Sequence, residues 1–268
     1  MPGLADYRKS SKIKALVFGG YKTGKTAGAG TFPRTNFIDC DKGIATLTNP
    51  ELEKKYGYMQ KVVSYGQFIE TEKTARGVPT RHLAFDAACK YFDEWNQKDK
   101  RDLYDTWVID SGTTLGEFAR NKAIILLGGT EFSAKPLSHT HKAAMNTGMI
   151  VPKLQDFGAE RSLLEQFVDM VLDTDKNVLL LSHERDEWEG EPPNERKVAI
   201  TPMFTGQSAQ RIPLKFDEVW NLRIEKEGTG WKRYLQTVPD GLRQCGSRLG
   251  LPTGTPFEYE AIKKALNL

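Results

Sequence analysis

The sequence contains little cysteine and no long hydrophobic run. Its three cysteines, Cys40, Cys89 and Cys245, lie far apart and form no C-x-x-C pair. This spacing suggests neither a disulfide framework nor a zinc ribbon, and it fits a reducing cytosol. No apolar stretch approaches the length of a bilayer span, and the polar start MPGLADYRKSSK lacks a signal-peptide core. We therefore expect a cytoplasmic protein with no membrane segment.

The chain also lacks a strong charge of either sign. Lys and Arg number 38 against 35 Asp and Glu, so the net charge is +3. This value is ordinary for a soluble protein and too small to prove a polyanionic partner, so any surface for nucleic acid must be local. At 268 residues the chain can form one large α/β domain with a full core. We expect that domain over residues 12–268, after a short N-terminal tail (1–11).

What the sequence does contain is a phosphate-binding motif. Residues 19–26 (GGYKTGKT) match the pattern G-x-x-x-x-G-K-[ST], and the apolar run KIKALVF directly before them predicts the strand that such a loop follows. The loop's N–H groups would point at the phosphates, Lys25 would add a charge, and the Thr26 hydroxyl would bind Mg²⁺. A Gly/Lys-rich surface turn is the alternative. The residues expected to contact the nucleotide are Gly19, Gly20, Tyr21, Lys22, Thr23, Gly24, Lys25 and Thr26.

Two short predicted strands end in acids. Asn36–Asp39 leads into DCDKG, which places Asp41 at the carboxyl edge of a sheet, where open α/β folds hold ligands. Asp41 is a candidate for orienting the attacking water, although a solvated turn aspartate explains it equally. Thr106–Asp110 (TWVID) ends in Asp110, which we expect beside Thr26 as the second Mg²⁺ residue.

The segments after Asp110 are of two kinds. Thr114 and Glu117 form a capping box, which predicts a helix over Leu115–Leu127. Residues 128–157 show no long periodic pattern and predict a mobile basic loop. The loop either contacts a nucleic-acid backbone or is a solvated insertion. Its basic side chains are Lys135, Lys142, Lys153, His139 and His141.

The C-terminal half predicts one buried strand, an acidic segment and a hairpin. Asn177–Ser182 (NVLLLS) ends in Ser182-His183, a polar pair that can sense a γ-phosphate, and the acidic segment 184–197 follows. Strands over Val198–Phe204, Asp217–Glu225 and Trp231–Val238 come next, the last two joined by a GTG turn. Lys232 and Arg233 lie there between Trp231 and Tyr234, a combination of cations and aromatics that can bind single-stranded DNA, although a solvated hairpin is equally ordinary.

A family resemblance connects these motifs. The ordered set GGYKTGKT, GAGTFP, FIDCDKG, TWVIDS, LLLSHER and PMFTG…FDEVW resembles the phage nucleotide-binding AAA-type family, whose best-known members are the core-only RecA-like ATPases of the Sak-four recombinase group. The resemblance covers most of residues 12–252. It implies ATP hydrolysis with Mg²⁺, binding of single-stranded DNA, and a role in phage recombination or annealing in the host cytoplasm.

The resemblance also implies roles for individual residues. It makes 19–26 the phosphate loop, Asp110 the magnesium-side acid, and Ser182-His183 the sensor. Such recombinases commonly have glutamate at the position of Asp41. This departure implies slow turnover or, as a rival, a nucleotide-gated scaffold that does not hydrolyse ATP. A helicase or helicase loader is a further alternative.

The expected assembly is a homo-oligomer, ring or filament, in which a neighbouring subunit supplies a basic group to the γ-phosphate. A single-strand-binding protein is a further candidate partner. The candidate basic groups are Arg211, Lys215 and Arg248.

The predicted fold is a RecA-like, additional-strand P-loop core with a mostly parallel central sheet and a C-terminal antiparallel hairpin. The sensor strand should lie between the phosphate-loop strand and the strand that ends in Asp110. The predicted order is Asp217–Glu225, Lys12–Phe18, Asn177–Ser182, Thr106–Asp110 and Asn36–Asp39.

Overall fold

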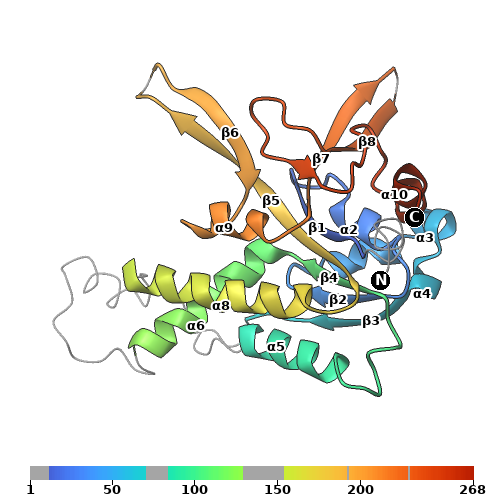
Figure 1. Ribbon diagram of the computed structural model, residues 1–268, viewed down its shortest axis with the longest axis horizontal. Helices are drawn as coiled ribbons and strands as arrows, with labels where there is room; N and C mark the ends of the chain where they lie inside the picture. Colours follow the sequence, from blue (N-terminus) through green and yellow to red (C-terminus); the bar gives the residue numbers. More distant parts are fainter. Residues whose placement is uncertain (1–11, 71–83, 129–153, 192, 229) are drawn as a thin grey trace, which may run out of the picture.

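A nine-stranded sheet forms the centre of the computed structural model, which describes residues 12–70, 84–128, 154–191, 193–228 and 230–268 (Figure 1). Its main path runs β3-β2-β4-β5-β1-β7-β8; β6 pairs with β5 and β9 pairs with β7. The strands are β1 (Lys14–Gly19), β2 (Thr35–Asp39), β3 (Val62–Gln67), β4 (Thr106–Asp110), β5 (Asn177–Glu189), β6 (Arg196–Pro202), β7 (Glu218–Glu227), β8 (Gly230–Gln236) and β9 (Gly246–Ser247).

This order confirms the predicted fold. β5 lies between β1 and β4 and is parallel to both, which is the additional-strand arrangement. β7 is parallel to β1 on its other side and antiparallel to β8, so the C-terminal hairpin closes that edge of the sheet. A mostly parallel sheet with antiparallel edge strands is the RecA-like form of the P-loop fold.

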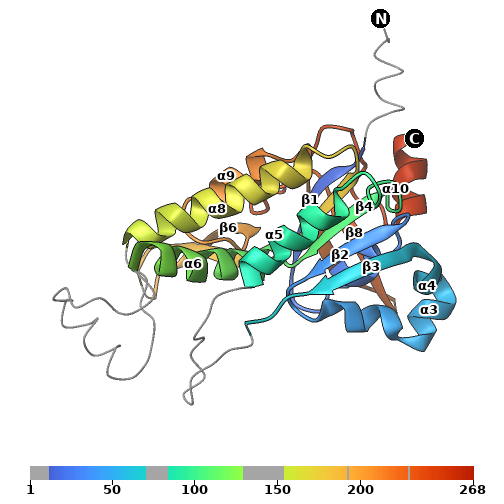
Figure 2. The same ribbon diagram turned by 90° about the horizontal axis from the view of Figure 1, so that it is seen from below.

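Helices cover both faces of the sheet. On one face lie α5 (Ala84–Trp95), α6 (Gly112–Gly128), α8 (Leu154–Leu172) and α9 (Ser208–Leu214), as Figures 1 and 2 show. The other face packs against α2 (Lys25–Ala29), η1 (Gly43–Thr48), α4 (Tyr58–Lys61) and α10 (Tyr259–Leu266), with α3 (Pro50–Tyr56) beside η1. No helix in these described ranges is both long and apolar enough to cross a membrane.

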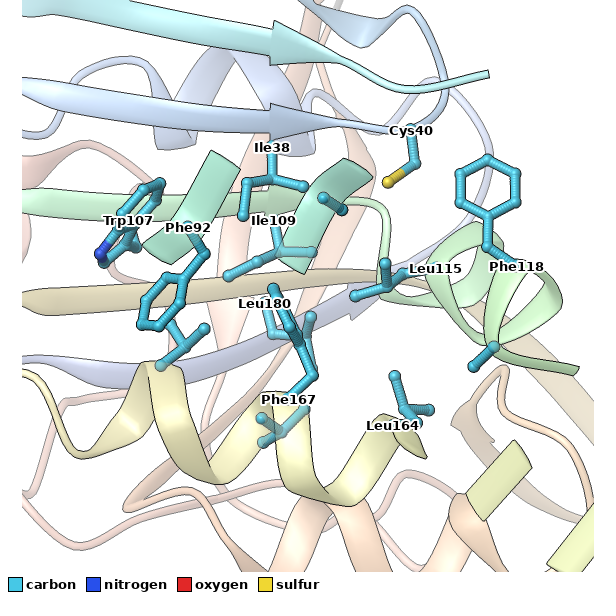
Figure 3. Close-up of a cluster of buried hydrophobic side chains, with 14 of the residues drawn as sticks. Ile38, Cys40, Phe92, Trp107, Ile109, Leu115, Phe118, Leu164, Phe167 and Leu180 are labelled. Carbon is cyan, nitrogen blue, oxygen red and sulfur yellow. The ribbon is translucent and has the colours of Figure 1, made fainter. Parts of the chain in front are cut away.

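The strands contribute to two cores because side chains alternate along them. Ile38, Ile109 and Leu180 point toward α8 and its Phe167, as Figure 3 shows. Their chain neighbours point to the opposite face, where Phe37 and Val108 are examples. The inner strands are thus buried on both faces, as all five residues of β2 and of β4 are.

The prediction that the sensor strand ends at Ser182-His183 is wrong. β5 continues to Glu189, and the predicted acidic segment pairs with β6 as an antiparallel arm. Opposite charges meet across its strands: Lys197 Nζ lies 2.6 Å from Asp186 Oδ2, and Arg196 donates to Glu189 over 2.8 Å. Charged residues of the segment predicted only as acidic therefore support strand pairing.

The capping-box prediction is also wrong. α6 begins at Gly112, so Thr114 lies inside the helix, and the Ser111 hydroxyl accepts a hydrogen bond from the Thr114 N–H over 3.3 Å. α8 begins at Leu154, inside the segment 128–157 that was predicted as a loop. Three lysines and two histidines proposed for that loop lie outside the described residues: Lys135, Lys142, Lys153, His139 and His141.

Candidate nucleotide site

The phosphate loop connects β1 to the short helix α2. Its turn requires glycine at two positions. Gly24 has φ 99°, and a Cβ on Gly19 would lie 2.6 Å from the carbonyl oxygen of Leu222 on β7. Lys25 is 7% exposed, and its ammonium donates to the carbonyl oxygens of Gly19 and Gly20, each over 2.9 Å. Lys25 therefore lies inside the loop that it is expected to serve.

Asp110 and Thr26 meet at the carboxyl edge of the sheet. Thr26 donates from Oγ1 to Oδ2 of Asp110 over 2.6 Å. Burial raises the pKa of Asp110 to about 6; the charges of Asp41 and Asp39 add to this effect, and the Thr26 hydrogen bond opposes it. A nearby cation stabilises the ionised form of such a carboxylate.

The donor set at this edge fits Mg²⁺. A hydroxyl and a carboxylate are the hard oxygen ligands that Mg²⁺ binds alongside substrate phosphates. In the described part of the chain, no cluster of three or more His, Cys, Asp or Glu could hold an ion alone, so phosphate oxygens would complete the shell. Gly43 keeps the space free, since a Cβ there would lie 2.5 Å from Asp110 Oδ2 and 3.1 Å from Thr26 Oγ1.

Asp41 lines the same cavity as Lys25, and polar side chains contact its carboxylate. Its Oδ1 accepts a hydrogen bond from Thr114 Oγ1, and its Oδ2 lies 3.6 Å from His183 Nε2. Burial tends to raise the pKa of Asp41, but hydrogen bonds from His183, Thr114 and Ser111 outweigh it and lower the pKa. Asp41 is therefore ionised at neutral pH and can accept a hydrogen bond from water.

Asp39 holds the turn that carries Asp41. Its side chain is fully buried, and Oδ1 accepts a hydrogen bond from the N–H of Gly43 over 2.8 Å. Gln67 on β3 donates to Oδ2 over 3.2 Å. Sequence reasoning gave Asp39 no role, although an acid two residues before Asp41 in DCDKG was the available signal.

The two predicted sensor residues differ in position. His183 lines the cavity, whereas Ser182 does not. The Ser182 hydroxyl is buried, donates to the His183 carbonyl over 2.9 Å, and lies 3.1 Å from Thr113 Oγ1. Of the two, only the His183 side chain is placed to meet a nucleotide.

One cavity of about 810 Å³ is lined by Lys25, Thr26, Asp41, Asp110 and His183. Another part of the cavity wall is formed by Tyr56 of α3 and by the segment 256–258. The Tyr56 hydroxyl donates a hydrogen bond to Glu258 Oε1 over 2.8 Å. This wall reaches the phosphate loop because Gly28 of α2 packs directly on Phe257, where a Cβ would come within 2.2 Å of the ring. Nothing in the sequence pattern indicated this half of the cavity.

Comparison with known proteins agrees with this geometry. The family model described as AAA domain matches residues 11–249. The chain belongs to this AAA domain family. Among solved structures, a KaiC-like protein from the hyperthermophilic archaeon Pyrococcus horikoshii is similar with a TM-score of 0.41 and 12% identity, over 91% of this chain and 87% of that chain. No curated protein sequence matches significantly.

The basic residues expected to act on a neighbouring subunit all lie in the described part of the chain. Three of them do not line the cavity and form ion pairs on their own chain: Arg211 with Glu165 (2.7 Å), Lys215 with Asp169 (2.7 Å) and Arg248 with Asp217 (2.8 Å).

The hairpin pair Lys232 and Arg233 divides between two environments. Lys232 lies 3.6 Å from Glu227 on the neighbouring strand, whereas Arg233 lines the nucleotide cavity. The two residues are adjacent in sequence, so they point to opposite faces of β8.

Proposed function

We propose that this AAA domain binds ATP with Mg²⁺ and hydrolyses it slowly. The observation that carries the proposal is the 2.6 Å contact between Thr26 Oγ1 and Asp110 Oδ2, beside the buried Lys25. Mg²⁺, when bound, would neutralise charge on the β- and γ-phosphates. The chain itself supplies the loop N–H groups and the Lys25 ammonium, which stabilise the charge that develops on the transferred phosphoryl group.

Asp41 is the residue best placed to orient the attacking water. It is ionised, lines the cavity, and is held by Thr114 on one oxygen and near His183 on the other. An aspartate is one methylene shorter than a glutamate, so it reaches less far toward the γ-phosphate. This shorter reach supports slow turnover.

Phosphate release at steady state tests the proposal. Wild-type protein should release phosphate from ATP with Mg²⁺ and not with EDTA, and a Lys25→Ala variant should be inactive. The rival, a nucleotide-gated scaffold, binds ATP without releasing phosphate. Binding of a fluorescent ATP analogue, measured in parallel, separates slow hydrolysis from binding alone and from no binding.

We further propose that the protein is a homo-oligomer that binds single-stranded DNA, in a phage recombination or annealing role. The β7–β8 hairpin supports this proposal because Trp231 is 67% exposed beside Lys232, and exposed aromatics with cations suit single strands. In the acidic β5–β6 arm, Arg196 pairs with Glu189 and Lys197 with Asp186, and Figure 1 draws the arm and the β7–β8 hairpin as separate projections. The recombination role itself comes from the sequence resemblance.

Titration of a labelled oligonucleotide tests the DNA proposal, with and without ATP. Stimulation of phosphate release by single-stranded DNA would support a coupled activity. ATP-driven unwinding of a duplex would instead favour a helicase. A single-strand-binding protein can be added to the same assay as a candidate partner.

A further inference from the structure

The β7–β8 hairpin extends beyond the edge of the sheet to the level of the phosphate loop. β1 pairs with β7 as far as Phe18 with Asn221, whereas β7 runs on to Glu227. Ile224, three residues after Asn221, pairs with Arg233 on β8. At about 3.3 Å per residue, Arg233 lies roughly 10 Å past the last β1 pair, beside the loop that follows β1.

Arg233 touches the phosphate loop of its own chain. Its Cδ and Nε atoms lie 3.3 Å and 3.5 Å from the point where a Cβ on Gly24 would lie, and the residue lines the cavity with Lys25 and Asp110. β5 separates β1 from β4, which carries Asp110, and β7 separates β1 from β8, which carries Arg233. The two residues therefore approach the loop from its two sides.

The guanidinium of Arg233 is free in the ranges that the structure describes. No ion pair or hydrogen bond joins it to another described residue, and it is exposed. Two other cations of the same hairpin are paired: Arg223 lies 2.8 Å from Glu225 and Lys232 lies 3.6 Å from Glu227. Arg233 therefore keeps its hydrogen-bond donors for a ligand in the cavity.

We propose that Arg233 binds the phosphate chain of a nucleotide that occupies the phosphate loop of the same chain. A guanidinium presents several N–H donors in a planar fork that matches phosphate oxygens, and it stays charged at any working pH. The inference rests on the proposed ATP binding. It moves Arg233 from a DNA surface to the nucleotide site, and it makes the hairpin part of that site.

Nucleotide affinity is the first test. With the fluorescent analogue mant-ATP and Mg²⁺, Arg233→Ala should weaken binding about ten- to hundred-fold, the range expected for charged hydrogen bonds. Arg233→Lys should fall between that variant and wild type. Arg196→Ala is the matched control, since it removes an exposed arginine from the other hairpin, where it pairs with Glu189. Wild-type affinity in Arg233→Ala would overturn the proposal.

A mixing experiment tests whether Arg233 acts on its own chain. Arg233→Ala and Lys25→Ala variants are combined at equal concentration, and phosphate release is measured. Because each chain then lacks one required group, the mixture should be no more active than the two variants alone. Recovered activity would mean that Arg233 reaches a neighbour's loop, which overturns the assignment. If wild-type protein binds no nucleotide at all, the proposed function fails first and the inference fails with it.

Discussion

Thr26 donates a hydrogen bond to Asp110 over 2.6 Å, although the two residues are 84 positions apart in the chain. They meet because β1 and β4 are parallel, flank β5, and end at the same edge of the sheet. The contact joins the last residue of the phosphate loop and the acid at the end of β4 into one site. It also makes the site's chemistry sensitive to single substitutions.

Lys25→Ala should abolish ATP hydrolysis. The ammonium is buried in the loop and is expected to contact the γ-phosphate, so its loss should lower kcat by at least about 10²-fold. Phosphate release with Mg²⁺ measures the effect. Lys54→Ala, on the outer surface of α3, serves as the control. Hydrolysis that survives Lys25→Ala in a pure preparation would show that the mechanism is wrong.

Asp110→Asn should stabilise the protein at neutral pH when Mg²⁺ is removed. Folding raises the pKa of Asp110 from 3.8 to about 6, so the native state binds more protons between these values. The free energy of unfolding of the wild type therefore falls, through this group, as pH rises from about 4 to about 6. The amide cannot ionise, and its advantage at pH 7 should be about 2–3 kcal/mol.

Chemical denaturation in EDTA at pH 4 and pH 7 checks this prediction. The two proteins should have similar stability at pH 4 and differ at pH 7. The same variant should lose stabilisation by Mg²⁺-ATP, because the ion's protein carboxylate is gone. An Asp110→Asn protein that is less stable than wild type at both pH values would contradict the burial argument.

Gly43→Ala should disable the Mg²⁺ site without removing any ligand. The added methyl group would lie 2.5 Å from Asp110 Oδ2, so the carboxylate must move away from Thr26. We expect Mg²⁺-dependent ATP affinity to fall about tenfold or more, measured by titration with a fluorescent analogue. Gly158→Ala on α8 is the matched control, since its Cβ would meet no atom within 4 Å. Equal affinities in the two variants would contradict the prediction.

The sequence predicted the inner strands well because β1, β4 and the first part of β5 contain apolar runs that stop at the phosphate loop, at Asp110 and at Ser182. It predicted the pair Thr26 and Asp110 for the same reason, since parallel strands bring their carboxyl ends together. β5 was predicted to end at Ser182 because its continuous apolar run ends there and charged residues follow. Cross-strand ion pairs such as Asp186 with Lys197 cannot be seen until the register of the two strands is known.

The features that the sequence did not predict are contacts between segments far apart in the chain. Glu258 accepts a hydrogen bond from Tyr56, 202 positions away in the chain. Arg233 contacts the phosphate loop from β8, at the edge of the sheet. No local pattern specifies either contact. They depend on how far β7 and β8 extend past the sheet and on the packing of Phe257 against Gly28.

Asp41→Asn should separate binding from hydrolysis. The amide keeps the shape of the side chain but cannot take a proton, so kcat should fall about 10²-fold or more while affinity for ATP stays within about threefold of wild type. Single-turnover phosphate release gives the rate, and analogue titration gives the affinity. An unchanged rate would assign the water to another residue. A wild type that binds ATP without measurable release would support the scaffold alternative.

Single-stranded DNA binding should depend steeply on salt and require both the lysines of segment 128–157 and Trp231 of the β7–β8 hairpin. For single strands the slope of log affinity against log salt is about −0.7 per phosphate contact, so replacing Lys135, Lys142 and Lys153 together by Ala should flatten it by about 2. Trp231→Ala should weaken binding by about 1–3 kcal/mol at every salt concentration, since stacking on an exposed ring is independent of counterions.

Fluorescence anisotropy with a labelled oligonucleotide, across a salt series with and without ATP, measures both effects. A triple variant of Lys54, Lys90 and Lys98 is the control for net charge, and it should keep the wild-type slope. If wild-type protein binds no oligonucleotide even at low salt, with or without nucleotide, the DNA role is wrong and a phosphate-loop ATPase remains.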